Sequence, residues 1–374
     1  MMIANLAYAG KEAIMEQSLG NAHLKLIETV GGAPKKGQWT NQLINGDNLP
    51  ALSLLAQDQS IKGKVRLVYI DPPFATGQSF NGKHSDEIAY DDTLQGPAFL
   101  EFLRQRLVLI RELMADDGSI YVHIDTKIGH YVKVLMDGVF GPEHFINDIT
   151  RIKCNPKNFE RKAYGNYKDI ILFYSKSSDY VWNEAREEMT KEELDRLFPK
   201  TDRDGRHYTT TPLHAPGITR NGPTGGLWKG ISPPSRRHWR YNPDELTRLN
   251  DAGLIEWSSK NNPRLKIYAD DAEKNGKKRQ DIWEFKDPAH PDYPTEKNLE
   301  MLKTIVNASS NEGDIVLDAF CGSGTTLLAS EILHRRWIGI DSSPVAMRIA
   351  KKKLKQTLAS FDLYELEIQD TLSI

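Results

Sequence analysis

The sequence is poor in cysteine and contains no long apolar run. Its two cysteines, Cys154 and Cys321, lie far apart and form no CxxC pair, which argues against a disulfide scaffold or a cysteine-ligated zinc site and favours a reducing compartment. Its apolar stretches, such as residues 170–174, are far shorter than the roughly 20 residues that a membrane-spanning helix needs. The N-terminus has neither a basic segment nor a long apolar one. We therefore expect a cytoplasmic protein that is neither secreted nor inserted in a membrane.

An excess of charge of either sign is also missing. The 49 Lys and Arg residues stand against 51 Asp and Glu residues, a net charge of -2, so any contact with a nucleic acid has to be local. Residues 151–176 carry seven Lys and Arg against two acids, and residues 218–242 carry five and no acid. These two segments are the candidates to face phosphates.

The overall composition is that of an ordinary globular protein. The chain has 374 residues, 39% of them hydrophobic and 27% charged, with a mean hydropathy of -0.53. It contains no low-complexity tract or internal repeat, which excludes disordered and fibrous classes. The length predicts two lobes or one large fold with an insertion.

Apolar runs and helical patterns alternate through much of the chain. An apolar, β-branched run at 65–70 predicts a buried strand that ends at Pro72 and Pro73. Further elements are expected as helices at 97–114, 128–139, 299–308 and 345–358 and strands at 119–124, 146–152, 169–174, 315–318 and 337–340. This alternation indicates an α/β fold.

Residues 179–292 break the alternation and predict an inserted lobe. Turn formers and prolines are frequent there. Asn242 as N-cap and Gly253 as stop predict a short helix, and residues 254–257 and 264–268 predict a hairpin.

A glycine turn follows the strand expected at 315–318 and opens a helix. It contains Gly322 and Gly324, where a ligand can approach the backbone closely. Asp341 lies nineteen residues after Gly322, at the end of the next strand, where a carboxylate can accept both ribose hydroxyls of a nucleoside. Leu327 replaces the third glycine of a dinucleotide fingerprint and no lysine of a phosphate loop follows, which leaves a sulfonium nucleoside without phosphates. The alternative is a turn that only permits tight packing.

A second motif, Asp71-Pro72-Pro73-Phe74, stands at a strand end where open α/β sheets bind ligands. An exocyclic base amine has two N–H donors, which match the Asp71 carboxylate and the Pro72 carbonyl. Phe74 can stack on the base. The alternative is an N-cap Asp followed by prolines that start a helix.

Together the two motifs resemble those of the DNA amino-methyltransferases that use S-adenosylmethionine. The catalytic motif precedes the cofactor motif with a variable region between them, as in the permuted β group of adenine-N6 and cytosine-N4 enzymes. Residues 45–49 resemble the family's element near the cofactor adenine, residues 121–125 its next sheet strand and residues 293–297 the lead-in near the methionine moiety. Phe74 replaces the commoner Tyr, and Glu296 and Asn298 stand where the family usually has Gln and Pro.

The resemblance implies a doubly wound, mostly parallel, Rossmann-like methyltransferase sheet with an inserted target-recognition lobe. Its parts are an N-terminal extension (1–39), a catalytic half (40–178), the target-recognition region (179–292) and a cofactor-binding half (293–374). The implied cofactor is S-adenosylmethionine, with S-adenosylhomocysteine as product and no metal. The implied catalytic residues are Asp71, Pro72, Pro73 and Phe74. The implied cofactor-binding residues are Asp47, Asn48, Thr295, Lys297, Asp318, Phe320, Gly322, Ser323, Gly324, Thr325, Asp341 and Ser342.

The implied reaction is base flipping followed by direct displacement at the exocyclic N6 of adenine in duplex DNA. A C5-cytosine enzyme is excluded because neither cysteine follows a proline as its nucleophile would. Asp at position 71 favours adenine over cytosine N4. An RNA base, a glutamine amide and a non-catalytic DNA-binding relative stay open as alternatives.

Duplex contact is assigned to the basic and aromatic residues of the inserted lobe, which are Trp228, Lys229, Arg236, Arg237, His238, Trp239 and Arg240. The alternative is that they pack the lobe and face solvent. His123 and Asp125 are expected to be structural or to support the catalytic residues, and not to be catalytic themselves. A homodimer and a cognate restriction endonuclease are candidate partners besides duplex DNA.

Overall fold

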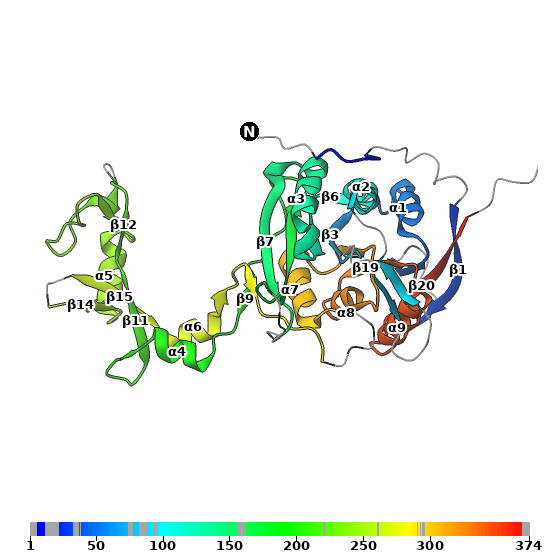
Figure 1. The fold of residues 1–374 in the computed structure, drawn as a ribbon. Helices are drawn as coiled ribbons and strands as arrows, with labels where there is room; N and C mark the ends of the chain where they lie inside the picture. The colour runs from blue at the N-terminus through cyan, green and yellow to red at the C-terminus, as the bar shows by residue number, and fades with distance from the viewer. Residues whose placement is uncertain are drawn as a thin grey trace, which may run out of the picture. The chain divides into compact units, whose positions relative to one another are not determined.

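The computed structural model contains two compact units, which are described separately. The first comprises Met1–Glu184 and Gln280–Ile374, and the second comprises Ala185–Arg279 (Figure 1). The structure describes residues 6–11, 22–32, 37, 39–73, 78–81, 88–92, 96–155, 160, 162–219, 222–259, 262–289, 291, 293 and 296–368, with only the backbone at 78–81 and 88–92.

A ten-stranded sheet forms the centre of the first unit. Its strands, in spatial order, are β1 (Ala22–Val30), β20 (Phe361–Ile368), β2 (Asn41–Asn45), β19 (Arg336–Asp341), β18 (Ile315–Asp318), β3 (Val65–Ile70), β6 (Met114–Ile124), β8 (Lys168–Ser175), β7 (Phe145–Ile152) and β17 (Ile282–Trp283). The run from β20 to β6 is parallel, whereas β1 and β8 run antiparallel to their neighbours. The sheet is therefore mostly parallel, as the sequence predicted.

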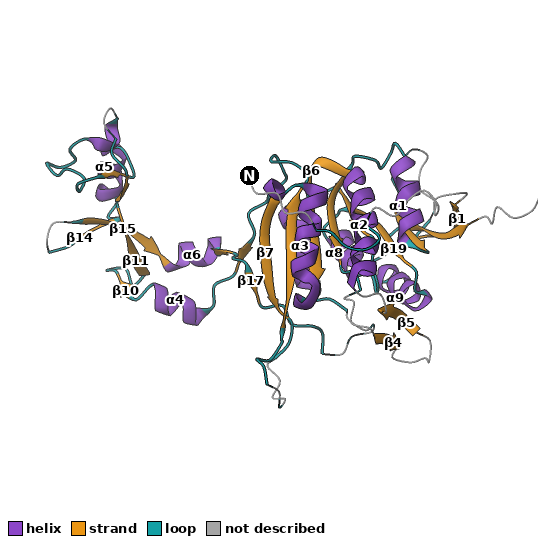
Figure 2. Ribbon diagram, turned by 45° about the horizontal axis from the view of Figure 1, so that its top comes forward, coloured by secondary structure: helices purple, strands orange, loops and turns teal. Residues whose placement is uncertain are grey.

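Helices pack on both faces of this sheet (Figure 2). They are α1 (Asn48–Gln57), α2 (Gly96–Leu113), α3 (Thr126–Phe140), α7 (Leu299–Ser309), α8 (Thr325–Ile332) and α9 (Pro344–Lys355). Strand β3 shows the division, because Val68 and Ile70 join the core beneath α1, α2 and α3 while Leu67 and Tyr69 join the core beneath α7. A strand buried on both faces is typical of a doubly wound α/β sheet, which confirms the predicted fold class. A hairpin of β4 (Gln78–Asn81) and β5 (Ile88–Asp92) and a short 3-10 helix, η2 (Pro142–His144), complete the elements of this unit.

The second unit has its own small core. Its main sheet has the order β10 (Lys200–Thr201), β11 (His207–Pro212), β15 (Pro263–Tyr268) and β14 (Ile255–Trp257). The other elements are α4 (Lys191–Leu197), α5 (Pro243–Asp251), α6 (Ala269–Asn275), η3 (Pro223–Gly225) and the pairs β12 (His214–Pro216) with β13 (Arg237–Trp239) and β9 (Arg186–Glu187) with β16 (Lys277–Lys278). The predicted short helix is α5, and Asn242 caps it by accepting from the Glu245 N–H. The predicted hairpin is β14 with β15.

Several boundaries differ from the predicted ones. The second unit ends at Arg279, short of the predicted 292, because β17 pairs with β7 in the large sheet and Trp283 is buried in the first unit's core. The predicted N-terminal extension contributes β1 to that sheet. Gly118, expected to close a helix, lies inside β6. Among the described helices, none has the length and apolar character that a membrane crossing requires.

Candidate functional site

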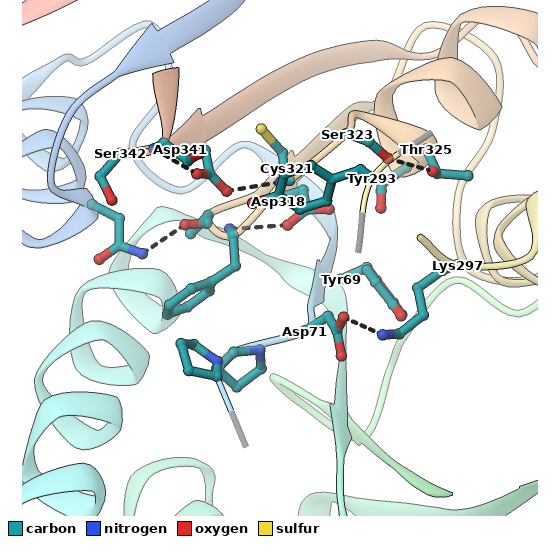
Figure 3. A pocket seen from close by; sticks show the side chains of 18 of the residues that line it. Tyr69, Asp71, Tyr293, Lys297, Asp318, Cys321, Ser323, Thr325, Asp341 and Ser342 are labelled. Carbon is teal, nitrogen blue, oxygen red and sulfur yellow. Dashed lines mark hydrogen bonds and ion pairs between the residues drawn. The ribbon is translucent and has the colours of Figure 1, made fainter. Parts of the chain in front are cut away.

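Four carboxylate residues stand at the carboxyl ends of four adjacent parallel strands. In order across the sheet, Asp47 follows β2, Asp341 ends β19, Asp318 ends β18 and Asp71 follows β3. All four line one cavity of about 550 Å³. Figure 3 shows three of them, Asp71, Asp318 and Asp341. Because parallel strands end at the same edge, the topology brings together segments that are far apart in sequence.

Most of the predicted site residues lie around this cavity. Those that line it are Asp47, Asn48, Asp71, Pro72, Pro73, Lys297, Asp318, Phe320, Gly322, Ser323, Thr325, Asp341 and Ser342. Gly324 is not among the lining residues. Phe74 and Thr295 lie outside the described residues.

The glycine turn after β18 depends on left-handed backbone conformations. Gly322 and Gly324 have φ angles of 49° and 76°. A Cβ on Gly324 would lie 2.9 Å from the Ala350 Cβ of α9, so this glycine allows α8 and α9 to pack closely. A Cβ on Gly322 would meet only the Tyr293 ring, at 3.6 Å. Gly324 therefore shapes the turn from outside the cavity, whereas Gly322 faces it.

Asp341 ties the glycine turn to the start of α9. Its Oδ2 accepts from the Gly322 N–H at 2.8 Å, and its Oδ1 accepts from the Ser343 N–H at 2.9 Å. Burial raises the pKa of Asp341, while these backbone hydrogen bonds act against the rise. The carboxylate thus holds two chain segments in the wall of the cavity.

Asp318 has a strongly raised pKa. Burial raises its pKa to about 7, hydrogen bonds from Thr326 and the Phe320 N–H oppose the rise, and the nearby Asp71 and Asp341 add to it. A cationic ligand in the cavity would relieve this repulsion and favour the ionised carboxyl. The electrostatics of the cavity therefore favour a positively charged ligand.

Arg106 of α2 completes the wall near Asp47 and was not predicted from the sequence. Its Nη2 donates to the Asp47 Oδ1 at 2.8 Å, its Nε donates to the Asn48 side chain, and its guanidinium lies 3.5 Å from the centroid of the Phe102 ring. Burial lowers its pKa to about 10. Its position among the apolar residues on one face of the expected helix 97–114 was a signal that a buried, partnered arginine lies there.

Asp71 meets Lys297 inside the cavity. The Lys297 Nζ lies 2.5 Å from the Asp71 Oδ2. The Asp71 Oδ1 is buried and has no hydrogen-bond partner within the part of the chain that the structure describes. The two oxygens of this carboxylate therefore differ: one is paired with Lys297, and the other is buried and lacks a hydrogen-bond partner among the described residues.

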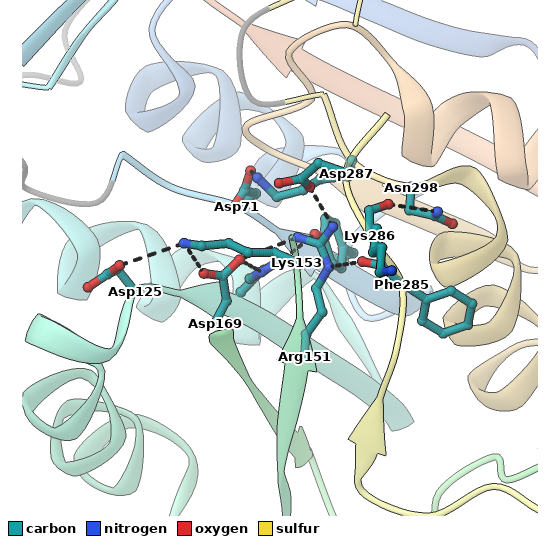
Figure 4. Close-up of polar contacts among 12 residues, drawn as sticks. Asp71, Asp125, Arg151, Lys153, Asp169, Phe285, Lys286, Asp287 and Asn298 are labelled. Atoms are coloured by element: carbon teal, nitrogen blue, oxygen red, sulfur yellow. Dashed lines mark hydrogen bonds and ion pairs between the residues drawn. The ribbon is translucent and has the colours of Figure 1, made fainter. Parts of the chain in front are cut away.

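A buried polar network supports the strand end behind Asp71 (Figure 4). Tyr69, which lines the cavity, contacts the His123 Nδ1 through its hydroxyl at 2.8 Å, and the His123 Nε2 lies 3.0 Å from the Asp169 Oδ2. Burial lowers the pKa of His123 and so favours the neutral ring. For Asp169, burial opposes ionisation, but hydrogen bonds and charges from His123 and Lys153 outweigh it and lower the pKa. His123 therefore contacts the cavity wall through Tyr69 and does not itself line the cavity.

The residues predicted to contact DNA fall into two groups within the second unit. Lys229, Arg236, Arg237 and Arg240 are exposed, and His238 is half-buried. Trp228 and Trp239 are instead buried in its core, with ring centroids 6.1 Å apart. The prediction that these two tryptophans face DNA is wrong, because a lobe this small needs them to form its core.

The described residues contain no group of three or more His, Cys, Asp or Glu side chains placed to hold a metal ion.

Comparison with known proteins identifies close similarity over most of the chain. Residues 65–352 match a family model described as DNA methylase, the N6/N4 methyltransferases. The Type II methyltransferase M.EcaI of Enterobacter cloacae is 47% identical over 319 residues, which cover 84% of this chain and 69% of that protein. The probable type III restriction-modification enzyme HindVI Mod subunit of Haemophilus influenzae is 27% identical over 386 residues, which cover 85% of this chain and 50% of the subunit. The chain therefore spans about half the length of that type III relative.

Among solved structures, the M1.HpyAVI–SAM complex is 17% identical and aligns with a TM-score of 0.45 over 84% of this chain and 99% of that one. The cytosine-N4-specific PvuII DNA methyltransferase is 14% identical, with a TM-score of 0.44 over 85% of this chain and 92% of that one.

Proposed function

Because this chain belongs to the N6/N4 family of DNA methylases, we propose that it methylates the exocyclic N6 of adenine in duplex DNA with S-adenosylmethionine as donor. The observation that carries the proposal is the single cavity that Asp71 and the glycine turn share. An acceptor for a base amine and a site for a nucleoside cofactor have to lie side by side if a methyl group is to pass directly between them.

S-adenosylmethionine is the methyl donor of this family, and it supplies an activated methyl group on a sulfonium sulfur. The residues of the cavity suit it. Asp318 carries a raised pKa beside two other carboxylates, an arrangement that a cation relieves. Gly322 leaves room for close approach at the turn, and Asp341 stands beside it at the end of β19. We assign the cofactor to the side of the cavity formed by β2, β19 and β18.

The target amine is assigned to Asp71 and the Pro72 carbonyl. The buried, unpartnered Oδ1 of Asp71 can accept one N–H of the amine, and the carbonyl can accept the other. When both hydrogens of the amine are held by these two acceptors, the lone pair of its nitrogen points toward the methyl group of S-adenosylmethionine. Because an amine paired inside a duplex cannot reach this cavity, the base has to leave the stack, which costs a few kcal/mol.

The second unit is assigned to duplex binding and target recognition. Its exposed basic side chains at Lys229, Arg236, Arg237 and Arg240 supply the local positive charge that phosphate binding needs in a chain with no net positive charge. The buried tryptophans stabilise the lobe and are not part of this surface.

Partners and a cellular location are part of the proposal. The HindVI relative is named as a restriction-modification subunit, and we propose that this chain likewise protects DNA against a cognate restriction endonuclease. We propose a cytoplasmic homodimer, in keeping with its DNA substrate.

Nucleoside mass spectrometry tests the proposal. Unmethylated genomic DNA is incubated with the protein and S-adenosylmethionine, and with the Asp71→Ala variant as control. N6-methyladenine that is absent from the control is the expected result. N4-methylcytosine would contradict the choice of adenine while keeping the chemistry, and the absence of any methylated base would overturn the proposal.

A further inference from the structure

Lys297 lies where two roles are open to it. The sequence resemblance assigned it to the cofactor. In the structure, however, its ammonium forms an ion pair with the carboxylate that is assigned to the target base, with the Lys297 Nζ 2.5 Å from the Asp71 Oδ2 (Figure 3). The two side chains are only 9% and 17% exposed, so water competes little for this pair.

The pair makes the two oxygens of Asp71 unequal. The ammonium occupies Oδ2, while Oδ1 is buried without a hydrogen-bond partner within the described chain. A carboxylate that is free to rotate about its Cβ–Cγ bond could present either oxygen. An ion pair with one oxygen restricts this rotation, and the other oxygen is left as the unpaired acceptor for a base that enters the cavity.

Lys297 is itself held in place from both sides. The next residue, Asn298, caps α7 by accepting from the Met301 N–H at 3.1 Å, and its side chain donates to the Lys286 carbonyl at 3.0 Å. The preceding residue, Glu296, forms an ion pair of 2.6 Å with Lys353 of α9. The backbone that carries Lys297 is therefore anchored to two helices, which fixes the point from which its side chain reaches Asp71.

On the basis of the proposed function, we propose that Lys297 is a positioning residue for Asp71: its ammonium holds Oδ2, so that Oδ1 alone accepts the exocyclic amine of the target base. The role links the two halves of the domain, because Lys297 precedes α7 in the cofactor-binding half and Asp71 follows β3 in the catalytic half. It also differs from a cofactor contact, since it acts on the base acceptor.

Two substitutions in the full chain separate the two roles. Lys297→Met removes the ammonium and keeps an apolar stem of similar length, and Lys297→Arg keeps the positive charge. Lys303→Met is the matched control, because Lys303 forms an ion pair with Glu300 on the surface of α7, away from the cavity. Isothermal titration calorimetry gives the dissociation constant for S-adenosylmethionine without DNA, and transfer of a labelled methyl group to DNA gives kcat and KM.

We expect Lys297→Met to lower kcat by about 10- to 100-fold while the dissociation constant for S-adenosylmethionine stays within about threefold of wild type. Lys297→Arg should recover most of kcat, and Lys303→Met should match wild type. A loss of cofactor affinity as large as the loss of kcat would overturn the proposal, as would wild-type turnover by Lys297→Met.

A crystal structure of Lys297→Met tests the same inference without any turnover. More than one rotamer of the Asp71 carboxylate is expected, and a single unchanged rotamer would contradict the positioning role. This result is independent of the proposed function, which fails separately if the wild-type chain methylates no base.

Discussion

Arg106 and Asp47 are 59 residues apart in sequence, yet the Arg106 Nη2 donates to the Asp47 Oδ1 at 2.8 Å. Asp47 uses the same oxygen to cap α1 by accepting from the Leu49 N–H, and its side chain is 58% exposed. Arg106, whose side chain is 5% exposed, thus fixes an exposed carboxylate from behind. The start of α1 is held rigid before any ligand arrives.

Removing this support should weaken cofactor binding. Arg106→Met removes the ion pair with Asp47 and leaves the buried side-chain oxygen of Asn48 without the Arg106 donor, a cost of about 1–3 kcal/mol for that oxygen. We expect a loss of about tenfold in affinity for S-adenosylmethionine by calorimetry and a lower melting temperature. Arg111→Met, an exposed substitution on the same helix, should change neither. An unchanged dissociation constant for Arg106→Met would show that the Arg106 contacts support only the fold.

The sequence predicted the parts of the site that depend on local motifs. The expected strands at 65–70 and 315–318 form as β3 and β18, and both motifs lie at their carboxyl ends because parallel strands finish at one edge. Arg106 and the Lys297–Asp71 pair were missed because their partners are distant in sequence. A local pattern shows that a charge is buried, but only the fold shows what neutralises it.

Strands β1 and β20 escaped prediction for a related reason. Both contain many charged and partly exposed residues, and each is stabilised by the other across more than 300 residues, as in the register of Val30 with Phe361.

The two tryptophans show the opposite error, because they were predicted at the surface and are buried. The charged residues around Trp228 and Trp239 suggested a surface, whereas the need of a small lobe for large apolar side chains decided their burial.

Binding of S-adenosylmethionine should depend on pH through Asp318. Its pKa in the folded protein is raised by burial to about 7, so near neutral pH part of the population carries a proton there. A bound sulfonium cation favours the ionised carboxyl, so binding should release protons and tighten as the pH rises from about 6 to about 8. Calorimetry in two buffers of different ionisation enthalpy measures the proton release. If the wild type and Asp318→Asn released the same number of protons on binding S-adenosylmethionine, the assignment to Asp318 would be contradicted.

Without ligand, the raised pKa of Asp318 should make the folded protein less stable as the pH rises, whereas ligand affinity should increase over the same range. A carboxyl whose pKa is higher in the folded than in the unfolded state stabilises the fold most at low pH, and that contribution disappears as the pH rises through about 7. The contribution of Asp318 should therefore make the wild-type melting temperature fall between about pH 5 and pH 8, relative to Asp318→Asn. If the melting temperatures of the wild type and Asp318→Asn changed equally with pH over this range, Asp318 would not be the source of the pH dependence.

Duplex binding should respond to the exposed arginines of the second unit. Replacing Arg236 and Arg237 with Ala removes two phosphate contacts, so the slope of log affinity against log salt should flatten by about two. Fluorescence anisotropy with duplex DNA over a range of salt concentrations measures the slope. Arg248→Ala is the matched control, since Arg248 is exposed on α5 of the same unit and pairs with Glu245. The same slope in the double variant and the control would exclude these two arginines from the interface.

Trp239 should behave differently from its arginine neighbours although it lies in the same basic segment. The residue is 1% exposed and its Nε1 donates to the Gly226 carbonyl at 3.0 Å, so truncation to Ala leaves a cavity in the core of the second unit and removes this hydrogen bond. We expect a loss of about 3–5 kcal/mol in the stability of this unit, with tryptic cleavage inside 185–279 and unchanged affinity of the first unit for S-adenosylmethionine. Limited proteolysis followed by calorimetry tests both parts. If Trp239→Ala were as stable as the wild type but bound DNA more weakly, Trp239 would be a DNA contact and not a core residue.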